Sequence, residues 1–218
     1  MNLLPRALAL LLCLTLGACL FALQFGQRRF TEEESAGSAA DLAPTEWAFA
    51  RLRWYSATSG YYRGWWAMDY PKADRQFTMG MQRLTRLESR SIEHVVDINS
   101  DEIYDWPWIY AELAGRWQLT SEQAERLRTY LLRGGFLMVD NMHGDWEWAT
   151  FAAGIQMVFP DRPIEDLPTS DPIYHVLYDL DERYQVPRIS FVGRPYMPDA
   201  RIPRWRGIRD DQGRVMVA

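Results

Sequence analysis

The chain has 218 residues, of which 48% are hydrophobic and 24% are charged, and this composition excludes a disordered or a fibrous protein. The formal net charge is −5, which argues against a nucleic-acid-binding protein because such proteins present basic faces to phosphates. Domains usually contain about 100–200 residues. The length therefore predicts one domain with a sizeable core, and the aromatic content is unusually high, with ten Trp, eleven Tyr and nine Phe.

Residues 1–23 are predicted to be a signal peptide or a membrane anchor. Arg6 precedes an unbroken apolar stretch from Ala7 to Leu23, which is the pattern of an export signal. We therefore expect an exported protein that is periplasmic or membrane-anchored, with membrane association through its N-terminus. In an alternative, Leu16–Cys19 resembles a lipoprotein box and Cys19 is the acylated residue.

Both cysteines of the chain, Cys13 and Cys19, lie in this leader. Residues 24–45 are polar and rich in small residues, as is typical of a tether, and residues 46–218 are expected to form a single α/β domain. That domain has no thiol, which excludes a disulfide, a cysteine zinc site and a thiol nucleophile within it. We also find no phosphate-binding P-loop, G-x-G-x-x-G or G-x-S-x-G motif, and we expect no cofactor.

The first half of the domain contains three expected strands and one expected helix. Alternating side chains at the end of residues 47–55 are typical of a strand, and a loop follows. Apolar residues at helical spacing predict a helix over residues 74–88. Short apolar segments predict strands over 94–98 and 108–111.

The second half begins with the best-defined helix of the chain. Thr120 and Gln123 stand at the positions of a capping box, and Gly134 ends the helix. The continuous apolar run 136–139 is typical of a strand that is buried on both faces of a parallel sheet. A helix over 146–159 and two strands joined by a tight turn over 208–217 complete the pattern. Strands alternating with helices predict an α/β layered fold with a mostly parallel sheet flanked by helices.

The first candidate site follows the buried strand. In an open α/β sheet, ligands bind outside the carboxyl ends of the strands, and this strand delivers Asp140 and His143 to that edge, with Glu147 just beyond. Carboxylates and an imidazole so close together could bind a metal or exchange protons. In the alternative, Asp140 and Asn141 bond backbone groups of the turn and cap the next helix, which leaves His143 exposed.

A second candidate site follows the first strand and should reach the same edge. It contains Trp66 and Asp69, followed by Asp74 and Arg75. Tryptophan faces beside carboxylates suit the stacking of a sugar ring and the binding of its hydroxyls. In the alternative, one Trp fills the core and Asp74 caps the helix. A third cluster, Asp171–His175, contains Asp-Pro, which commonly initiates a turn, so a structural role is expected for His175.

Several ordered motifs make the chain similar to the bacterial domain-of-unknown-function family 4159, from about Trp47 to the C-terminus. They are Trp66–Asp74, Leu119–Thr120, Glu125–Arg128, Tyr130–Leu137, Val158–Pro160, Asp171–His175, Gln185–Pro187 and Arg206–Ile208. The resemblance implies a flavodoxin-like fold of the class I glutamine amidotransferase-like type. It also hints at an envelope protein complex as partner, because some longer relatives adjoin proteins of von Willebrand A type.

The chain departs from the family pattern in two places. The family usually has Asp-Asp-Phe-Trp-Gly after the buried strand, where this chain has Asp140-Asn141-Met142-His143-Gly144. Asn141 removes one carboxylate, which weakens any metal site that needs both. The family also continues beyond this C-terminus, so the resemblance implies that the domain is incomplete there. Amidotransferases of this fold use a cysteine nucleophile, and that chemistry does not carry over to a domain without cysteine.

Two functions follow as hypotheses. The first is an exported, envelope-facing binding or interaction module, with a ligand site formed by Trp66, Asp69, Asp74, Arg75, Asp140 and His143. The second is a hydrolase acting on a glycan or a related envelope substrate. There Asp140 or Asp69 would be the general base or a metal ligand, and His143 its partner. Convergence of Asp69 and Asp140 would favour the enzyme, whereas carboxylates engaged in helix caps would favour the module.

Overall fold

The structure is a computed structural model that describes residues 45–56, 64–182 and 204–218. The predicted leader, most of the predicted tether and Cys19 lie outside these ranges. All the described elements belong to one unit, Asp41–Ala218. Within the described ranges, no helix combines the length and the apolar character needed to cross a membrane.

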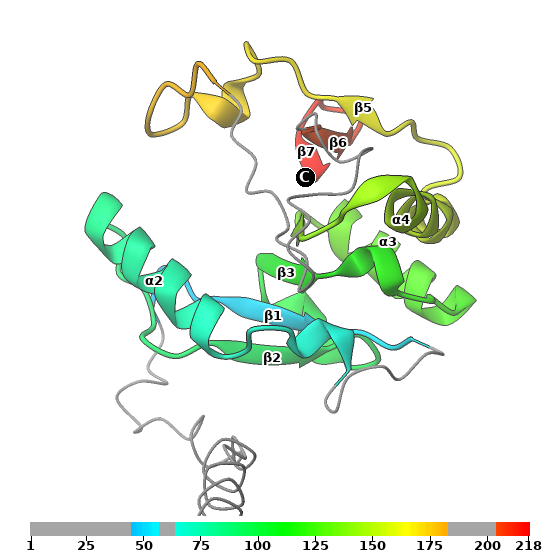
Figure 1. Ribbon diagram of the computed structural model, residues 1–218, viewed down its shortest axis with the longest axis horizontal. Coiled ribbons are helices and arrows are strands. Elements are labelled where there is room, and N and C mark those ends of the chain that lie inside the picture. The colour runs from blue at the N-terminus through cyan, green and yellow to red at the C-terminus, as the bar shows by residue number, and fades with distance from the viewer. Residues whose placement is uncertain (1–44, 57–63, 183–203) are drawn as a thin grey trace, which may run out of the picture. The chain divides into compact units, whose positions relative to one another are not determined.

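A seven-stranded sheet in the order β2-β1-β3-β4-β7-β6-β5 forms the centre of the fold (Figure 1). Five neighbouring strands are parallel, whereas β6 pairs antiparallel with β7, and β5 pairs antiparallel with β6. The expected α/β architecture with a mostly parallel sheet is therefore confirmed. The strands are β1 (Ala50–Arg53), β2 (His94–Asp97), β3 (Trp108–Glu112), β4 (Phe136–Asp140), β5 (Glu165–Asp166), β6 (Arg206–Arg209) and β7 (Val215–Val217).

The helices of the described ranges are three α-helices and four short 3-10 helices. The α-helices are α2 (Lys72–Leu84), α3 (Ser121–Leu132) and α4 (Gly144–Val158). The 3-10 helices that concern the site are η2 (Trp65–Ala67), η3 (Asp101–Asp105) and η4 (Ala114–Arg116), and η5 (Pro172–Tyr174) lies further along the chain. The expected capping box is confirmed, because the Thr120 hydroxyl accepts from the Gln123 amide and the Gln123 side chain accepts from the Thr120 amide.

The helix predicted over 74–88 ends earlier than its apolar spacing suggested. α2 ends at Leu84, and Thr85 is already extended. Beyond it, Glu88 and Arg90 hydrogen-bond to Trp47, so residues after Thr85 pair with the chain that leads into β1. This long-range pairing supplies the backbone with partners that a continued helix would have had to replace.

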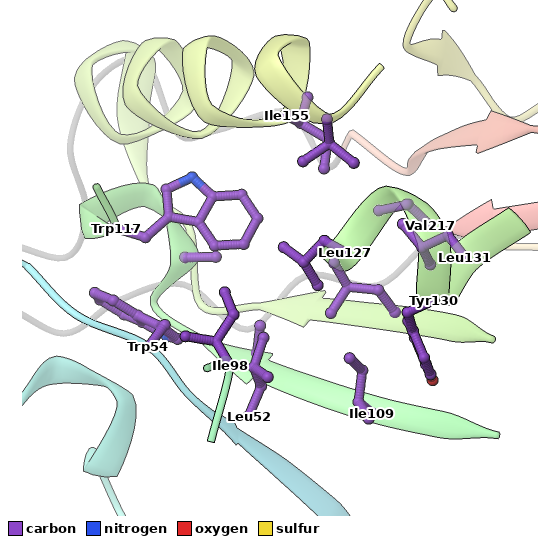
Figure 2. Packing of buried hydrophobic residues seen from close by; sticks show 14 of the residues in the cluster. Leu52, Trp54, Ile98, Ile109, Trp117, Leu127, Tyr130, Leu131, Ile155 and Val217 are labelled. Carbon is purple, nitrogen blue, oxygen red and sulfur yellow. The ribbon is translucent and has the colours of Figure 1, made fainter. Parts of the chain in front are cut away.

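Side chains on the two faces of the sheet pack against different helices. Leu52 and Ile109 point toward α3 and α4, where they meet Leu127 and Ile155 in the core (Figure 2). The opposite face carries aromatic rings, since Phe77 of α2 lies against Trp108 of β3 and against two rings from the segment that leads into β1, Trp47 and Phe49. Side chains alternate between faces along a strand, so Arg51 and Tyr110 share this second face.

Candidate functional site

Both predicted candidate segments begin at the carboxyl edge of the parallel strands. β1 leads through α2 to β2 on one side, whereas β3 leads through α3 to β4 on the other side, so the connections diverge between β1 and β3. Ligands in open α/β sheets bind at such a point. This edge therefore contains the groups that the sequence singles out and the groups with which they interact.

A buried hydrogen-bonded network lies at the ends of β3 and β4. The Tyr110 hydroxyl contacts the Glu112 carboxylate and lies 3.3 Å from Asp140 Oδ2. Asn141 Nδ2 donates to Glu112 Oε1 at 2.6 Å. Burial raises the pKa of the Glu112 carboxyl and the pKa of the Tyr110 hydroxyl. The register explains the meeting, because Glu112 and Asp140 are neighbours across parallel strands.

Asp140 and Asn141 form the turn that follows β4. Asp140 is exposed, and its Oδ1 accepts from the Asn141 amide at 2.6 Å. Asn141 has a left-handed backbone with φ 61°, a conformation that Asn adopts more readily than most residues. The turn chemistry proposed as the alternative for these two residues is therefore present, and it coexists with the contact to Glu112.

His143 stands at the start of α4 and is held at both its backbone and its ring. Its amide donates to Glu147 Oε2 at 2.8 Å, and its Nε2 lies 2.6 Å from Asn141 Oδ1. Glu147 is only 2% exposed, and its Oε1 accepts from Arg116 Nη2 at 2.6 Å. Glu147 thus satisfies the amide of His143, the N-cap residue of α4, and anchors an arginine of η4. The expected exposure of His143 is not observed, since its ring is half-buried.

Arg116 links α4 to the segment that follows β1. Its guanidinium carbon lies 4.4 Å from the centre of the Trp65 ring and 5.5 Å from that of Trp146. Trp146 is 64% exposed, whereas Trp65 is half-buried. The close approach of η4 to α4 needs a glycine, because a Cβ on Gly115 would lie 2.6 Å from the Glu147 Cβ. Arg116 therefore packs against the exposed ring of Trp146.

Asp74 and Arg75 are occupied by ion pairs. Asp74 is fully buried and makes a two-oxygen contact with the fully buried Arg51. Asp74 does not cap α2, whose N-cap is Pro71. Arg75 Nε donates to Glu93 Oε2 at 3.0 Å. Because it is shielded from solvent, Asp74 has no place on a ligand-binding surface.

Trp66 and Asp69 lie on the loop that Arg51 organises. Arg51 Nη1 donates to the carbonyl oxygen of Trp66 at 2.8 Å, and the Trp66 ring is half-buried. Asp69 is exposed with φ 56°, and its carbonyl oxygen accepts from the Ala73 amide. Among the interactions of the described residues, none joins Asp69 to Asp140. Nor do any three His, Cys, Asp or Glu side chains of the described ranges gather into a possible metal site.

A comparison with known protein families determines the family of this chain. The family model described as a domain of unknown function, DUF4159, matches residues 48–218. The chain belongs to the DUF4159 family. A comparison with curated proteins finds no match. The family assignment confirms the resemblance drawn from the motifs, and its description carries no activity, so the function of this DUF4159 domain must be argued from the carboxyl edge.

Sequence reasoning missed three important residues of this DUF4159 domain. Glu112, Arg116 and Tyr110 are joined to the predicted residues by contacts that span 29 to 31 positions of the chain. One signal was available for Glu112, since it directly follows the strand predicted over 108–111 and therefore stands at the same edge as Asp140. No local pattern singles out Arg116.

The contacts of His175, in the third candidate cluster, predict a contribution to stability that depends on pH. His175 Nδ1 lies 2.8 Å from Asp179 Oδ1, and Nε2 lies 2.9 Å from the carbonyl oxygen of Thr169. Both acceptors require a ring N–H, so they favour the imidazolium. The hydrogen bond to Asp179, helped by that to Thr169, raises the pKa of His175 above its ordinary 6.5. The structural role expected for His175 is consistent with these contacts.

The sign of the effect follows from the raised pKa. The contribution of His175 to stability should be complete below pH 6.5 and should disappear as the pH rises through the higher pKa of the folded state. A proton NMR titration of the His175 ring should give a pKa above 6.5, and Asp179→Asn should lower it. A pKa of His175 at or below 6.5 in the folded protein would contradict this assignment.

Proposed function

We propose that this DUF4159 domain is an exported binding module that recognises a neutral glycan at its carboxyl edge. The observation that carries the proposal is the state of the carboxylates. Asp74 forms an ion pair with Arg51. Glu147 accepts hydrogen bonds from the backbone at the start of α4 and from Arg116. Glu112 accepts hydrogen bonds from Tyr110 and Asn141. Carboxylates engaged in this way serve positioning rather than hydrolysis.

The ligand-facing part of this proposal is the exposed Trp146. Soluble domains usually bury most of a Trp, and a Trp that is 64% exposed beside polar groups offers an apolar face for a ring. Arg116 holds Trp146 from one side, and Glu147 anchors Arg116, so this platform is pre-organised. A pyranose ring can stack on such a face while its hydroxyls bond to polar neighbours.

Charge favours a neutral ligand over an acidic one. Asp140 and Asp145 are exposed close to Trp146 in the chain, and Arg116 is already paired with Glu147. An acidic sugar would meet the exposed carboxylate of Asp140 there, whereas hydroxyl groups can donate hydrogen bonds to it. The edge therefore suits hexose or N-acetylhexosamine units.

The strand order supports a more specific assignment of the fold class. The order β2-β1-β3-β4 followed by the parallel β7 is the order of flavodoxin-like sheets, in which ligands bind at the switch between the first and third strands. We infer that the domain has this flavodoxin-like, class I glutamine amidotransferase-like architecture. Export, membrane association through the N-terminus and partnership with an envelope protein complex belong to the same proposal, and the apolar run from Ala7 to Leu23 supports the export.

The test compares two exposed residues of α4. Calorimetric titration of the purified full chain with hexose and N-acetylhexosamine oligomers should detect binding. Trp146→Ala should weaken it about tenfold, because loss of an aromatic stacking contact costs about 1–1.5 kcal/mol. Met157→Ala, at a residue that is 47% exposed near the other end of α4, should leave the affinity unchanged.

Two outcomes would oppose this proposal. Equal binding by the Trp146→Ala variant and the wild-type chain would remove Trp146 from the site. Release of shorter sugars from the oligomers, abolished by Asp140→Asn, would establish the hydrolase in place of the binding module. Observation of neither binding nor cleavage with the whole panel would also overturn the glycan proposal.

A further inference from the structure

Three side chains from β3, the turn after β4 and the start of α4 are joined end to end. Glu112 accepts from Asn141, and Asn141 in turn contacts His143. We propose that Glu112 is a positioning residue of this site: through Asn141 it fixes the ring proton of His143 on Nε2. This inference goes beyond the proposed function, since it concerns the protonation of a histidine ring at the same edge of the sheet.

The first step is the orientation of the Asn141 amide. The Glu112 side chain is buried, and its two oxygens face two donors, the Tyr110 hydroxyl and Asn141 Nδ2. In its ionised form Glu112 can only accept hydrogen bonds, so the amide then turns its NH₂ toward Glu112. The opposite orientation would place Asn141 Oδ1 2.6 Å from a carboxylate oxygen, with no hydrogen between them.

The second step transfers this orientation to the histidine. With its NH₂ toward Glu112, the amide presents Oδ1 to His143 Nε2 at a distance of 2.6 Å. A carbonyl oxygen has no hydrogen to donate, so Nε2 must carry the proton. The neutral imidazole is then the Nε2–H tautomer, in which Nδ1 keeps the lone pair. The charge of Glu112 thus determines a property of a ring that it does not touch.

The third step is the rigidity of the arrangement. Glu112 ends β3 beside Asp140 of β4, so the parallel register sets its position. The His143 amide is bonded to Glu147, which is itself anchored by Arg116. The backbone and the ring of His143 are therefore held from separate elements, which fixes the orientation of the ring. The His143 ring is half-buried and lies three residues before Trp146, which is the third residue of α4.

The decisive experiment reads the tautomer directly. The chain contains three histidines, so nitrogen-15 NMR of histidine-labelled full chain can be assigned with the variant His143→Gln. At a pH where His143 is neutral, we expect a pyrrole-type shift for Nε2 and a pyridine-type shift for Nδ1. A predominant Nδ1–H tautomer in the wild-type chain would overturn the inference.

Variants separate positioning from packing. Glu112→Gln keeps the shape but can either donate to or accept from Asn141, so the amide can turn and both His143 shifts should move toward an average of the two tautomers. Asn141→Gly keeps the left-handed backbone accessible and removes the relay, with the same expected result. Unchanged His143 shifts in both folded variants would contradict the inference, because a purely structural role predicts no change.

A matched control is present in the same molecule. His94 Nε2 lies 2.6 Å from Glu102 Oε1, so Glu102→Gln should alter the His94 signals and leave those of His143 unchanged. Movement of the His143 shifts in this variant would show that they do not report the relay. The ligand titrations decide the other question: a fixed tautomer in a protein that binds no glycan would refute the proposed function and leave the role of Glu112 intact.

Discussion

Replacement of Asp74 by Ala is expected to lower the free energy of unfolding by about 3–5 kcal/mol, the usual cost of breaking a buried ion pair. Arg51 and Asp74 are both fully buried, and the guanidinium contacts both carboxylate oxygens. The alanine variant leaves the charge of Arg51 buried without its counterion. Urea denaturation of the variant and the wild-type chain, followed by circular dichroism, measures the difference.

The double variant Arg51→Met/Asp74→Leu serves as the control for this prediction. It removes both charges and should recover most of the loss, because apolar residues of similar size often replace a buried pair without cost. The remaining deficit should reflect the hydrogen bonds from Arg51 to the carbonyl oxygens of Trp66 and Met68. A loss below about 1 kcal/mol for Asp74→Ala would mean that the pair is accessible to water.

The second large effect is expected at Trp117, where replacement by Ala should cost about 3–5 kcal/mol. Trp117 is 1% exposed and stacks on Phe151 of α4, with ring centres 5.3 Å apart. It lies directly after η4 and belongs to the same core cluster as Leu127 and Ile155 (Figure 2). The cavity would loosen the contact between η4 and α4 on which Arg116 depends.

The exposed Trp146 of α4 provides the comparison. Trp146→Ala should change the free energy of unfolding by no more than about 0.5 kcal/mol, as is usual for surface substitutions. The two variants therefore separate stability from binding: Trp117→Ala should unfold at lower urea concentration, whereas Trp146→Ala should fold normally and bind weakly. Equal losses of stability in both variants would assign Trp146 to the core instead of the site.

Local patterns in the sequence were sufficient for most elements. The helix Ser121–Leu132 carries its own start in Thr120 and Gln123, and its capping box depends on residues only three positions apart. The apolar run that becomes β4 and the turn between β6 and β7 also follow from neighbouring residues. Asp140 and His143 were placed at the carboxyl edge by the same reasoning, because a parallel strand delivers the residues after it to that edge.

The tertiary structure decided the features that depend on distant partners. α2 stops at Leu84 because the chain beyond it pairs with Trp47, and Asp74 is buried because Arg51 of β1 meets it. Glu112 joins the site only because β3 lies beside β4 in this register. Sequence alone thus determined most of the secondary structure and the edge at which polar groups gather. Strand order and packing decide which of those groups form hydrogen bonds or ion pairs with one another, since the partners are far apart in the chain.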